Sequence, residues 1–264
     1  MSGELLYDVN EWVIFGGLFA LTLLGTEIGF RLGRRVRPNM NEYTRSHNAT
    51  IEAAALGLLA LLLGFTFSMA MSRYETRKRL VIEEANTIGT TLLRARFLTE
   101  PHRTEVASLL RRYVEVRLSF YQAGIDPERL RESNEETDQI HKALWSHAVA
   151  IGEQHPRENI MLLFITSLNE VLDFQAKRLA AKEDHVPELV VELLYGATIL
   201  SLGLVGYGCG LGGHRNFLST TTAALLIVSV ILVIVDLDRP RRGLIKVSQQ
   251  SLLTLRDSLS KSAP

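Results

Sequence analysis

The sequence predicts an all-α integral membrane protein, in which four transmembrane helices form two hairpins that flank a helical extramembrane domain. Four apolar stretches lie at about residues 12–30, 53–72, 193–210 and 217–235. Each is close to the ~20 residues that a helix needs to cross the hydrocarbon core. The region between the second and third stretches is instead rich in charged and helix-forming residues. Because a backbone in lipid must satisfy its own hydrogen bonds, we expect the apolar stretches to be helical.

The charge balance and the cysteine content exclude several classes of function. The 264 residues include 29 basic and 29 acidic side chains, so nothing indicates nucleic-acid binding. The segment Met1–Glu11 is acidic, whereas a secretory signal begins with basic residues, so we expect the first apolar stretch to be retained. Cys209 is the only cysteine, which excludes an internal disulfide and a cysteine-based zinc cluster.

Residues 1–72 are expected to form the first transmembrane hairpin. Pro38 and Asn39 mark a turn between its two spans, and Asn48–Thr50 predicts the N-cap of the second span. The sequence after this span contains no helix breaker for a long stretch. We therefore expect one continuous helix that extends to about Leu98.

Residues 73–185 are expected to form the helical extramembrane domain. Apolar residues recur here at the spacing of amphipathic helices, and proline or glycine residues separate the segments. The predicted helices after the long one cover about residues 101–121, 127–152 and 158–182.

Residues 186–236 are expected to form the second transmembrane hairpin, because the loop Gly210–Arg215 between its two spans is short. Gly206 and Gly210 make a small-xxx-small pair, which we interpret as a contact with the fourth span. Residues 237–264 predict an amphipathic helix at about 245–259, followed by a tail.

The distribution of basic residues predicts the topology. The amino-terminal tail has no lysine or arginine, whereas the loop after the first span has five arginines. The positive-inside rule then places the amino terminus and the helical domain outside the cell membrane, which is the inner membrane in a bacterium. Basic residues after the second span, Arg77, Lys78 and Arg79, argue for the opposite orientation.

The second span carries a row of small side chains along one side. Small residues recur every three or four positions from Ala53 to Ser72, which places them on one face of a helix. Such a face either allows close helix packing or lines a pore through which a small inorganic ion passes. The pore-lining candidates are Gly57, Ala60, Gly64, Thr66, Ser68 and Ser72.

Charged residues near the spans are candidates for ion selection. Glu27 lies four residues before Arg31, a spacing that also predicts a simple ion pair. Rings of carboxylates would favour cations, and rings of arginines would favour anions. The charge candidates are Glu27, Arg31, Glu52, Arg73 and Glu75.

No pattern indicates catalysis or a cofactor. His141, His147 and His155 lack the spacing of two histidines, four residues apart, that helical zinc sites use. The sequence has no glycine-rich phosphate loop and no nucleophile motif. We therefore expect no enzyme activity, metal or cofactor.

Several motifs together resemble a known family. The stretches Leu61–Ser68, Glu83–Gly89 and Arg111–Arg117 and the ending Asp236–Gly243 resemble the bestrophin-like family of membrane proteins, distant relatives of the bestrophin anion channels. The resemblance covers about residues 51–259. The motif residues to which it assigns a structural role are Glu84, Asn86, Arg94, Asp238, Arg239 and Pro240.

The resemblance implies a homo-oligomeric ion channel surrounded by membrane lipid. Bestrophins are pentameric channels whose pore is lined by the second span of each subunit, so a pentamer is expected. The alternative is a membrane-anchored sensor or scaffold, in which the hairpins hold a four-helix bundle on one side of the membrane. The channel predicts that Ser68 and Ser72 face water, and the sensor predicts that they pack against another helix.

Overall fold

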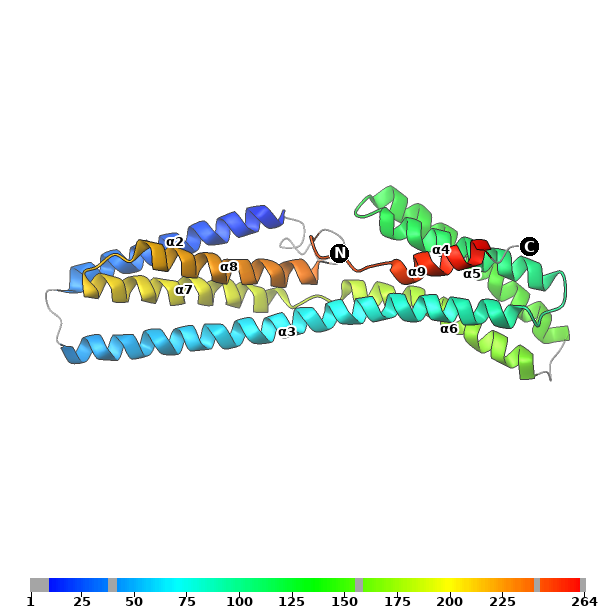
Figure 1. Ribbon diagram of the computed structural model, residues 1–264, viewed down its shortest axis with the longest axis horizontal. Helices are drawn as coiled ribbons and strands as arrows, with labels where there is room; N and C mark the ends of the chain where they lie inside the picture. The colour runs from blue at the N-terminus through cyan, green and yellow to red at the C-terminus, as the bar shows by residue number, and fades with distance from the viewer. Residues whose placement is uncertain (1–9, 38–41, 155–158, 240–242, 262–264) are drawn as a thin grey trace. The chain divides into compact units, whose positions relative to one another are not determined.

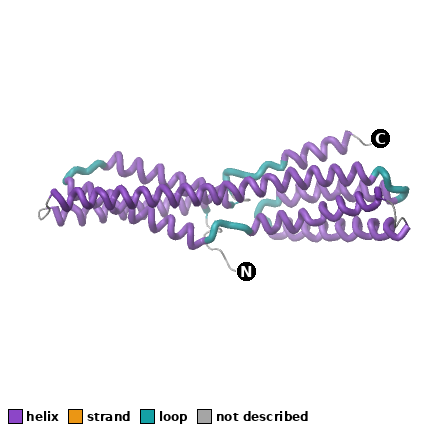
Figure 2. Tube along the Cα trace, turned by 90° about the horizontal axis from the view of Figure 1, so that it is seen from below, coloured by secondary structure: helices purple, strands orange, loops and turns teal. Residues whose placement is uncertain are grey.

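The computed structural model describes residues 10–37, 42–154, 159–239 and 243–261. Every regular element in this part of the chain is a helix (Figure 1), and turns and short loops connect them (Figure 2). The predicted all-α class is therefore confirmed for these residues. The helices are α2 (Glu11–Val36), α3 (Glu42–Ala95), α4 (His102–Gln122), α5 (Pro127–Gln154), α6 (Asn159–Glu183), α7 (Glu188–Gly212), α8 (Phe217–Asp238) and α9 (Gln250–Lys261).

Within the described residues, four helical stretches are long and apolar enough to cross a membrane. They are α2, residues Ser46–Ala95 of α3, the stretch Asn159–Gly212 that contains α6 and α7, and α8. Each of the four predicted spans lies inside one of these stretches. By length and composition, the chain is a multi-pass membrane protein.

The long helix α3 is continuous over 54 residues, as its sequence predicts. The N-cap predicted at Asn48–Thr50 is wrong, because α3 already begins at Glu42. Thr50 Oγ1 donates a hydrogen bond to the carbonyl of Ser46 at 3.1 Å. A threonine inside a helix bonds backwards in this way instead of capping the amino end.

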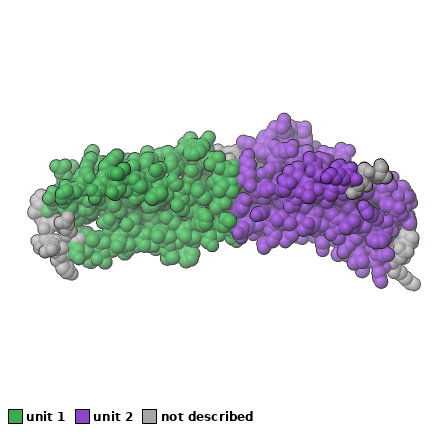
Figure 3. Space-filling model, in the orientation of Figure 1, with its two compact units in different colours: residues 1–73, 185–239, 243–245 green, residues 74–184, 240–242, 246–264 purple. Residues whose placement is uncertain are grey.

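The chain divides into two compact units, which Figure 3 colours separately. Unit 1 comprises residues 1–73, 185–239 and 243–245, and it holds α2, α7, α8 and the first part of α3. Unit 2 comprises residues 74–184, 240–242 and 246–264, and it holds α4, α5, α6, α9 and the rest of α3.

In unit 1, α2 and α7 pack so closely that only glycine fits at their contact. A Cβ atom added at Gly29 would overlap the backbone carbonyl of Gly203, and one added at Gly206 would overlap the carbonyl of Thr26. Gly33 and Gly210 are confined in the same way by backbone atoms of the opposite helix. We call these four residues, Gly29, Gly33, Gly206 and Gly210, the glycine seam.

The seam corrects one prediction about the third span. Gly206 and Gly210 were expected to contact the fourth span, α8, but they face α2. The loop to α8 is short, because Gly213 ends α7 with a left-handed φ of 76°. However, α2 offers a matching row of small residues that lets two backbones approach, whereas α8 is rich in bulky and β-branched side chains.

The core of unit 2 is built from the amphipathic faces of α4, α5 and α6 together with α3 and α9. Tyr113, Leu144 and Phe164 are fully buried in it. The helices α4, α5 and α6 begin and end within two residues of the predicted positions. The last helix starts later than predicted, at Gln250, and its buried Leu252 anchors it in this core.

Candidate functional site

The small residues of α3 face outward from the chain. Within the part of the chain that the structure describes, a Cβ atom added at Gly57 or at Gly64 would meet no other atom within 4 Å. This face of α3 is therefore not used for packing by the described residues of the same chain. Its exposed members are Gly57, Ala60, Gly64, Ser68 and Ser72.

The opposite face of α3 is packed inward. Leu59 and Thr66 are 2% exposed, and Ala70 is fully buried. Thr66 Oγ1 donates a hydrogen bond to the carbonyl of Leu62 at 2.8 Å. Thr66 therefore does not share the exposed face with the other five pore-lining candidates. Two residues of α-helix turn the side chain by about 200°, which separates Thr66 from Gly64.

Glu27 lies between two arginines in the second half of α2. Arg31 Nε donates a hydrogen bond to its carboxylate at 2.7 Å, so the ion pair indicated by the spacing is present. Arg215, from the loop before α8, also donates to Glu27 at 2.8 Å, and its guanidinium lies 4.5 Å from the ring centroid of Phe30. These contacts hold the end of α2 against the loop between α7 and α8.

The other three charge candidates lie on α3. Glu52 is partly exposed, and its carboxylate occupies the space in which a Cβ atom on Gly208 of α7 would stand. Arg73 is partly exposed, and Glu75 is exposed. These charges therefore lie before and just after the apolar stretch of α3.

In unit 2, the motif residue Glu84 is the centre of a buried ionic cluster. Its carboxylate accepts hydrogen bonds from the hydroxyl of Tyr113 at 3.0 Å and from Arg117 Nε at 2.9 Å. Arg178 of α6 donates to the second carboxylate oxygen. The Glu84 side chain has no exposed surface, and Arg117 is 2% exposed. The cluster ties α3, α4 and α6 together.

The charges in this cluster stabilise one another. Burial acts to raise the pKa of the Glu84 carboxyl, but Arg117 and Arg178 outweigh burial and hold this pKa below its ordinary value. Burial and the adjacent carboxylate raise the pKa of Tyr113, so its hydroxyl stays protonated as a donor. The cluster thus holds one carboxylate and two guanidinium groups, which leaves an excess of positive charge.

Sequence reasoning did not identify the partners of Glu84. A signal was present, because Glu84 follows Val81 and precedes Ile88 at the spacing of one helix face, and both neighbours are buried. Arg117 likewise follows the buried Tyr113 by one helical turn. A charged residue in an apolar helix stripe indicates a buried partner of opposite charge.

The two aspartates that end α8 bind backbone groups of unit 1. Asp238 accepts a hydrogen bond from the backbone N–H of Val186 at 2.9 Å. Asp236 accepts two more, from Leu244 at 2.6 Å and from Ile245 at 2.8 Å. These bonds connect the end of α8 with the segment before α7 and with the residues that follow α8.

The remaining motif residues have separate positions. Arg94 donates a hydrogen bond to the carbonyl of Leu163 at 2.7 Å, which joins α3 to α6. Asn86 is exposed, and Arg239 is buried. Pro240 lies outside the described residues.

Folding also brings together three residues that could ligate a metal. The donor atoms of His102, Glu105 and His147 lie within 4.8 Å of one another. However, His147 meets His102 through Nδ1 at 3.0 Å and Glu105 through Nε2 at 3.4 Å. These contacts join the three side chains in a chain from His102 through His147 to Glu105. His155 lies outside the described residues.

Comparison with known proteins assigns the family. The model of the bestrophin-like domain matches residues 16–252. The match begins in α2, so it also includes the first span, which the motif resemblance left out. A search of the curated proteins and a search of the solved structures each found no match. Because the domain match extends over nearly the whole chain, the protein belongs to the bestrophin-like family.

Proposed function

We propose that this protein is a homo-oligomeric ion channel in which the ion passes along α3. The observation that supports the proposal is the outward small face of α3, where the described part of the chain leaves open space beside Gly57 and Gly64. Lipid tails gain little by packing on glycine and serine, whereas a second copy or a column of water suits such a face. Membership of the bestrophin-like family supports a channel as well.

In the proposed assembly, the α3 helices of neighbouring subunits surround a common axis, and membrane lipid surrounds the other spans. Family resemblance favours five subunits. Ser68 and Ser72 then offer hydroxyl groups to a passing inorganic ion. The buried face of α3, with Leu59 and Ala70, packs against the subunit itself.

The charged residues of α3 are the ones that we propose for selectivity. Glu52, Arg73 and Glu75 lie at the ends of its apolar stretch, where rings of charge would meet an entering ion. Glu27 and Arg31 pair with each other, and we assign them a structural role at the end of α2. Whether the channel selects cations or anions depends on whether the carboxylate rings or the arginine ring has the stronger effect on the ion. The reversal potential under a salt gradient measures this selectivity.

We further propose that the amino terminus and unit 2 lie outside the cell membrane, as the arginines after the first span indicate. A reporter enzyme that is active only outside, fused after Pro264, tests this orientation. An active reporter supports this orientation. An inactive reporter on a folded, membrane-inserted protein indicates the opposite orientation.

A second candidate function is a membrane-anchored sensor or scaffold. It is supported by unit 2, a helical bundle with its own hydrophobic core and a buried ionic cluster around Glu84. On this alternative, the small face of α3 packs dry between copies, and no ion passes.

Ion flux separates the two functions. The purified protein is reconstituted into liposomes, and current is recorded under a salt gradient. We expect flux, and we expect Ser68→Val to lower it severalfold, because the substitution removes a hydroxyl from the path and adds two methyl groups. Leu58→Val, at an exposed leucine on another face of α3, is the control. A folded oligomer that passes no ion would make the sensor or scaffold the better candidate.

A further inference from the structure

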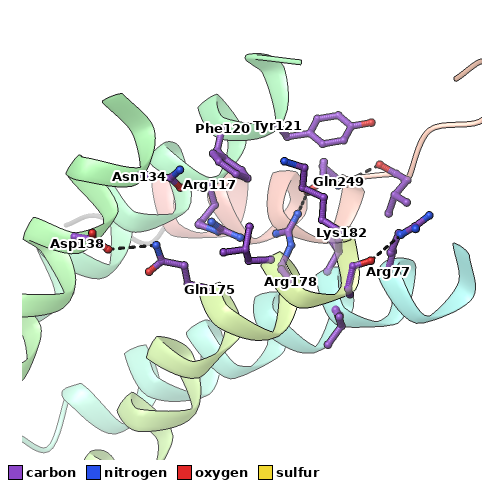
Figure 4. A pocket seen from close by; sticks show the side chains of 15 residues that line it. Arg77, Arg117, Phe120, Tyr121, Asn134, Asp138, Gln175, Arg178, Lys182 and Gln249 are labelled. Atoms are coloured by element: carbon purple, nitrogen blue, oxygen red, sulfur yellow. Dashed lines mark hydrogen bonds between the residues drawn. The ribbon is translucent and has the colours of Figure 1, made fainter. Parts of the chain in front are cut away.

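Unit 2 contains a cavity of about 310 Å³, a size typical of small-molecule sites. Residues of α3, α4, α5 and α6 and of the segment before α9 line it. Figure 4 shows that several of these side chains carry polar or charged groups at their ends. The cationic ones are Arg77, Arg117, Arg178 and Lys182.

Most of the charged side chains that line the cavity are cationic. Glu84 pairs with both Arg117 and Arg178, and Asp138 is the acidic residue of the wall. Asp138 accepts a hydrogen bond from Gln175 at 3.3 Å (Figure 4). Among the described side chains that line the cavity, four are therefore cationic and one is acidic.

Three of the cationic groups are poorly screened by water, whereas Lys182 is partly exposed. Arg117 is 2% exposed, and the Arg178 side chain is 14% exposed. Arg77 is 5% exposed and donates hydrogen bonds to the carbonyls of Ala181 and Asp184. Coulomb interactions are stronger in such surroundings than in bulk water. An anion that enters the cavity would offset part of the cost of burying these charges.

The rest of the wall is apolar or neutral. Leu80 and Val81 of α3, Phe120 of α4 and Leu179 of α6 offer aliphatic and aromatic surface. The amide of Gln249 belongs to the wall and accepts a hydrogen bond from Arg178 at 3.2 Å. The wall therefore suits a ligand that combines one acidic group with a hydrophobic body.

We propose that this cavity binds a small organic anion, which carries one carboxylate or phosphate group on an apolar body. The acidic group lies at Arg178 and Lys182, which are four residues apart on one face of α6. Guanidinium groups match the geometry of carboxylate and phosphate oxygens. The apolar body packs against Phe120 and Leu179. This site is additional to the proposed ion path along α3.

The test uses the purified full-length protein in a neutral detergent and three probes in isothermal titration. Phenyl phosphate carries both features of the expected ligand, inorganic phosphate carries only the charge, and benzyl alcohol carries only the ring. We expect phenyl phosphate to saturate one site per chain, with an affinity at least about tenfold higher than either other probe. Absence of saturable binding, or equal binding of benzyl alcohol, would overturn the proposal.

Two pairs of variants locate the binding site. Leu179→Trp adds bulk at the wall of the cavity, and Leu162→Trp makes the same change on α6 outside the wall; both leucines are exposed. Lys182→Glu reverses the charge of a side chain that lines the cavity. Lys177→Glu makes the same change of charge on α6 beside Phe174, outside the wall. We expect both cavity variants to lose at least about tenfold in affinity. Circular dichroism confirms that each variant is folded. Equal affinity for phenyl phosphate in all four variants would contradict the proposed location of the site.

The natural acidic group could belong to a free metabolite or to a lipid head group. Phenyl phosphate binding is therefore repeated in phosphatidylcholine nanodiscs with and without phosphatidylglycerol. Competition by phosphatidylglycerol supports the cavity as a head-group site, and its absence supports it as a site for a soluble anion. Because binding is measured without ion flux, failure of the channel proposal would leave this result intact.

Discussion

Two helices of unit 1 carry the same sequence signature and use it in opposite ways. In α2, Gly29 and Gly33 are closed in by the backbone of α7. In α3, Gly57 and Gly64 lie two helical turns apart on one face, but a Cβ atom added there would meet no atom of the described residues within 4 Å. A row of small residues thus predicts that another surface packs closely against the helix. It does not predict whether that surface belongs to the same chain.

This difference indicates which of the two rows of small residues is required for the fold of a single subunit. The glycine seam is completed within one chain, so its loss should destroy the fold of unit 1. The small face of α3 is left over after the described part of the chain has packed, so its loss should first affect what lies beyond the subunit. Substitutions in the glycine seam and on the small face of α3 test this distinction.

The largest effect is expected for Gly29→Leu. Its side chain would overlap the carbonyl of Gly203, and α2 and α7 would have to separate at a cost above about 3 kcal/mol. We expect no folded protein in detergent extracts, as judged by size-exclusion chromatography. Gly17→Leu on the same helix has open space and is the matched control. A monodisperse Gly29→Leu protein would contradict the seam.

The second effect is expected for Gly64→Leu. The subunit should fold, because this position is open, but the bulky side chain should prevent close approach of a second copy. Native mass spectrometry should show smaller species than the wild type, and ion flux should fall at least tenfold. Oligomers of unchanged mass would show that the α3 face is not an assembly surface.

The third effect concerns access of water to α3. Cys209 is first replaced by alanine, and single cysteines are then placed at Gly64, Ser68 and Thr66. We expect a water-soluble thiol reagent to modify the first two about tenfold faster than the third, because Thr66 is 2% exposed on the packed face. If neither Gly64→Cys nor Ser68→Cys ever reacts, the ion path along this face is wrong.

The smallest effect is expected for Gly57→Ala. Alanine has a higher helix propensity than glycine, by about 0.8–1 kcal/mol, and its methyl group has room at this position. Thermal unfolding in detergent should show unchanged or slightly raised stability. Gly206→Ala, the same substitution in the seam, should lower it. Equal responses at the two positions would remove the distinction between the rows.

Local patterns made most of the fold predictable from the sequence. The apolar runs of α2 and α8 and the boundaries of α4 and α5 follow from hydrophobic periodicity and from the positions of proline and glycine. The N-cap at Asn48–Thr50 failed because a residue type that favours caps is also tolerated inside a long helix, where Thr50 bonds back to Ser46.

Partners that are distant in the sequence were harder to predict. The pairing of Gly206 with α2 depends on a second row of glycines far from it in the chain, and the short loop to α8 favoured the wrong neighbour. Glu84 meets Arg178 from 94 positions away. Periodicity shows that such residues face inward, but it cannot say which inward face they meet.

The contacts of α2 with α7 and with the loop after α7 have a consequence for the timing of biosynthesis. Glu27 at the end of α2 is bound by Arg215, which follows it by 188 positions. At a synthesis rate of about 5–20 residues per second, roughly 10–40 s pass before the ribosome has supplied both. During this interval the glycine row of α2 must stay in the bilayer without its partner α7. The helix α2 is thus made well before its partner α7, and the nascent chain has to be kept from pairing this row with another polypeptide in the meantime.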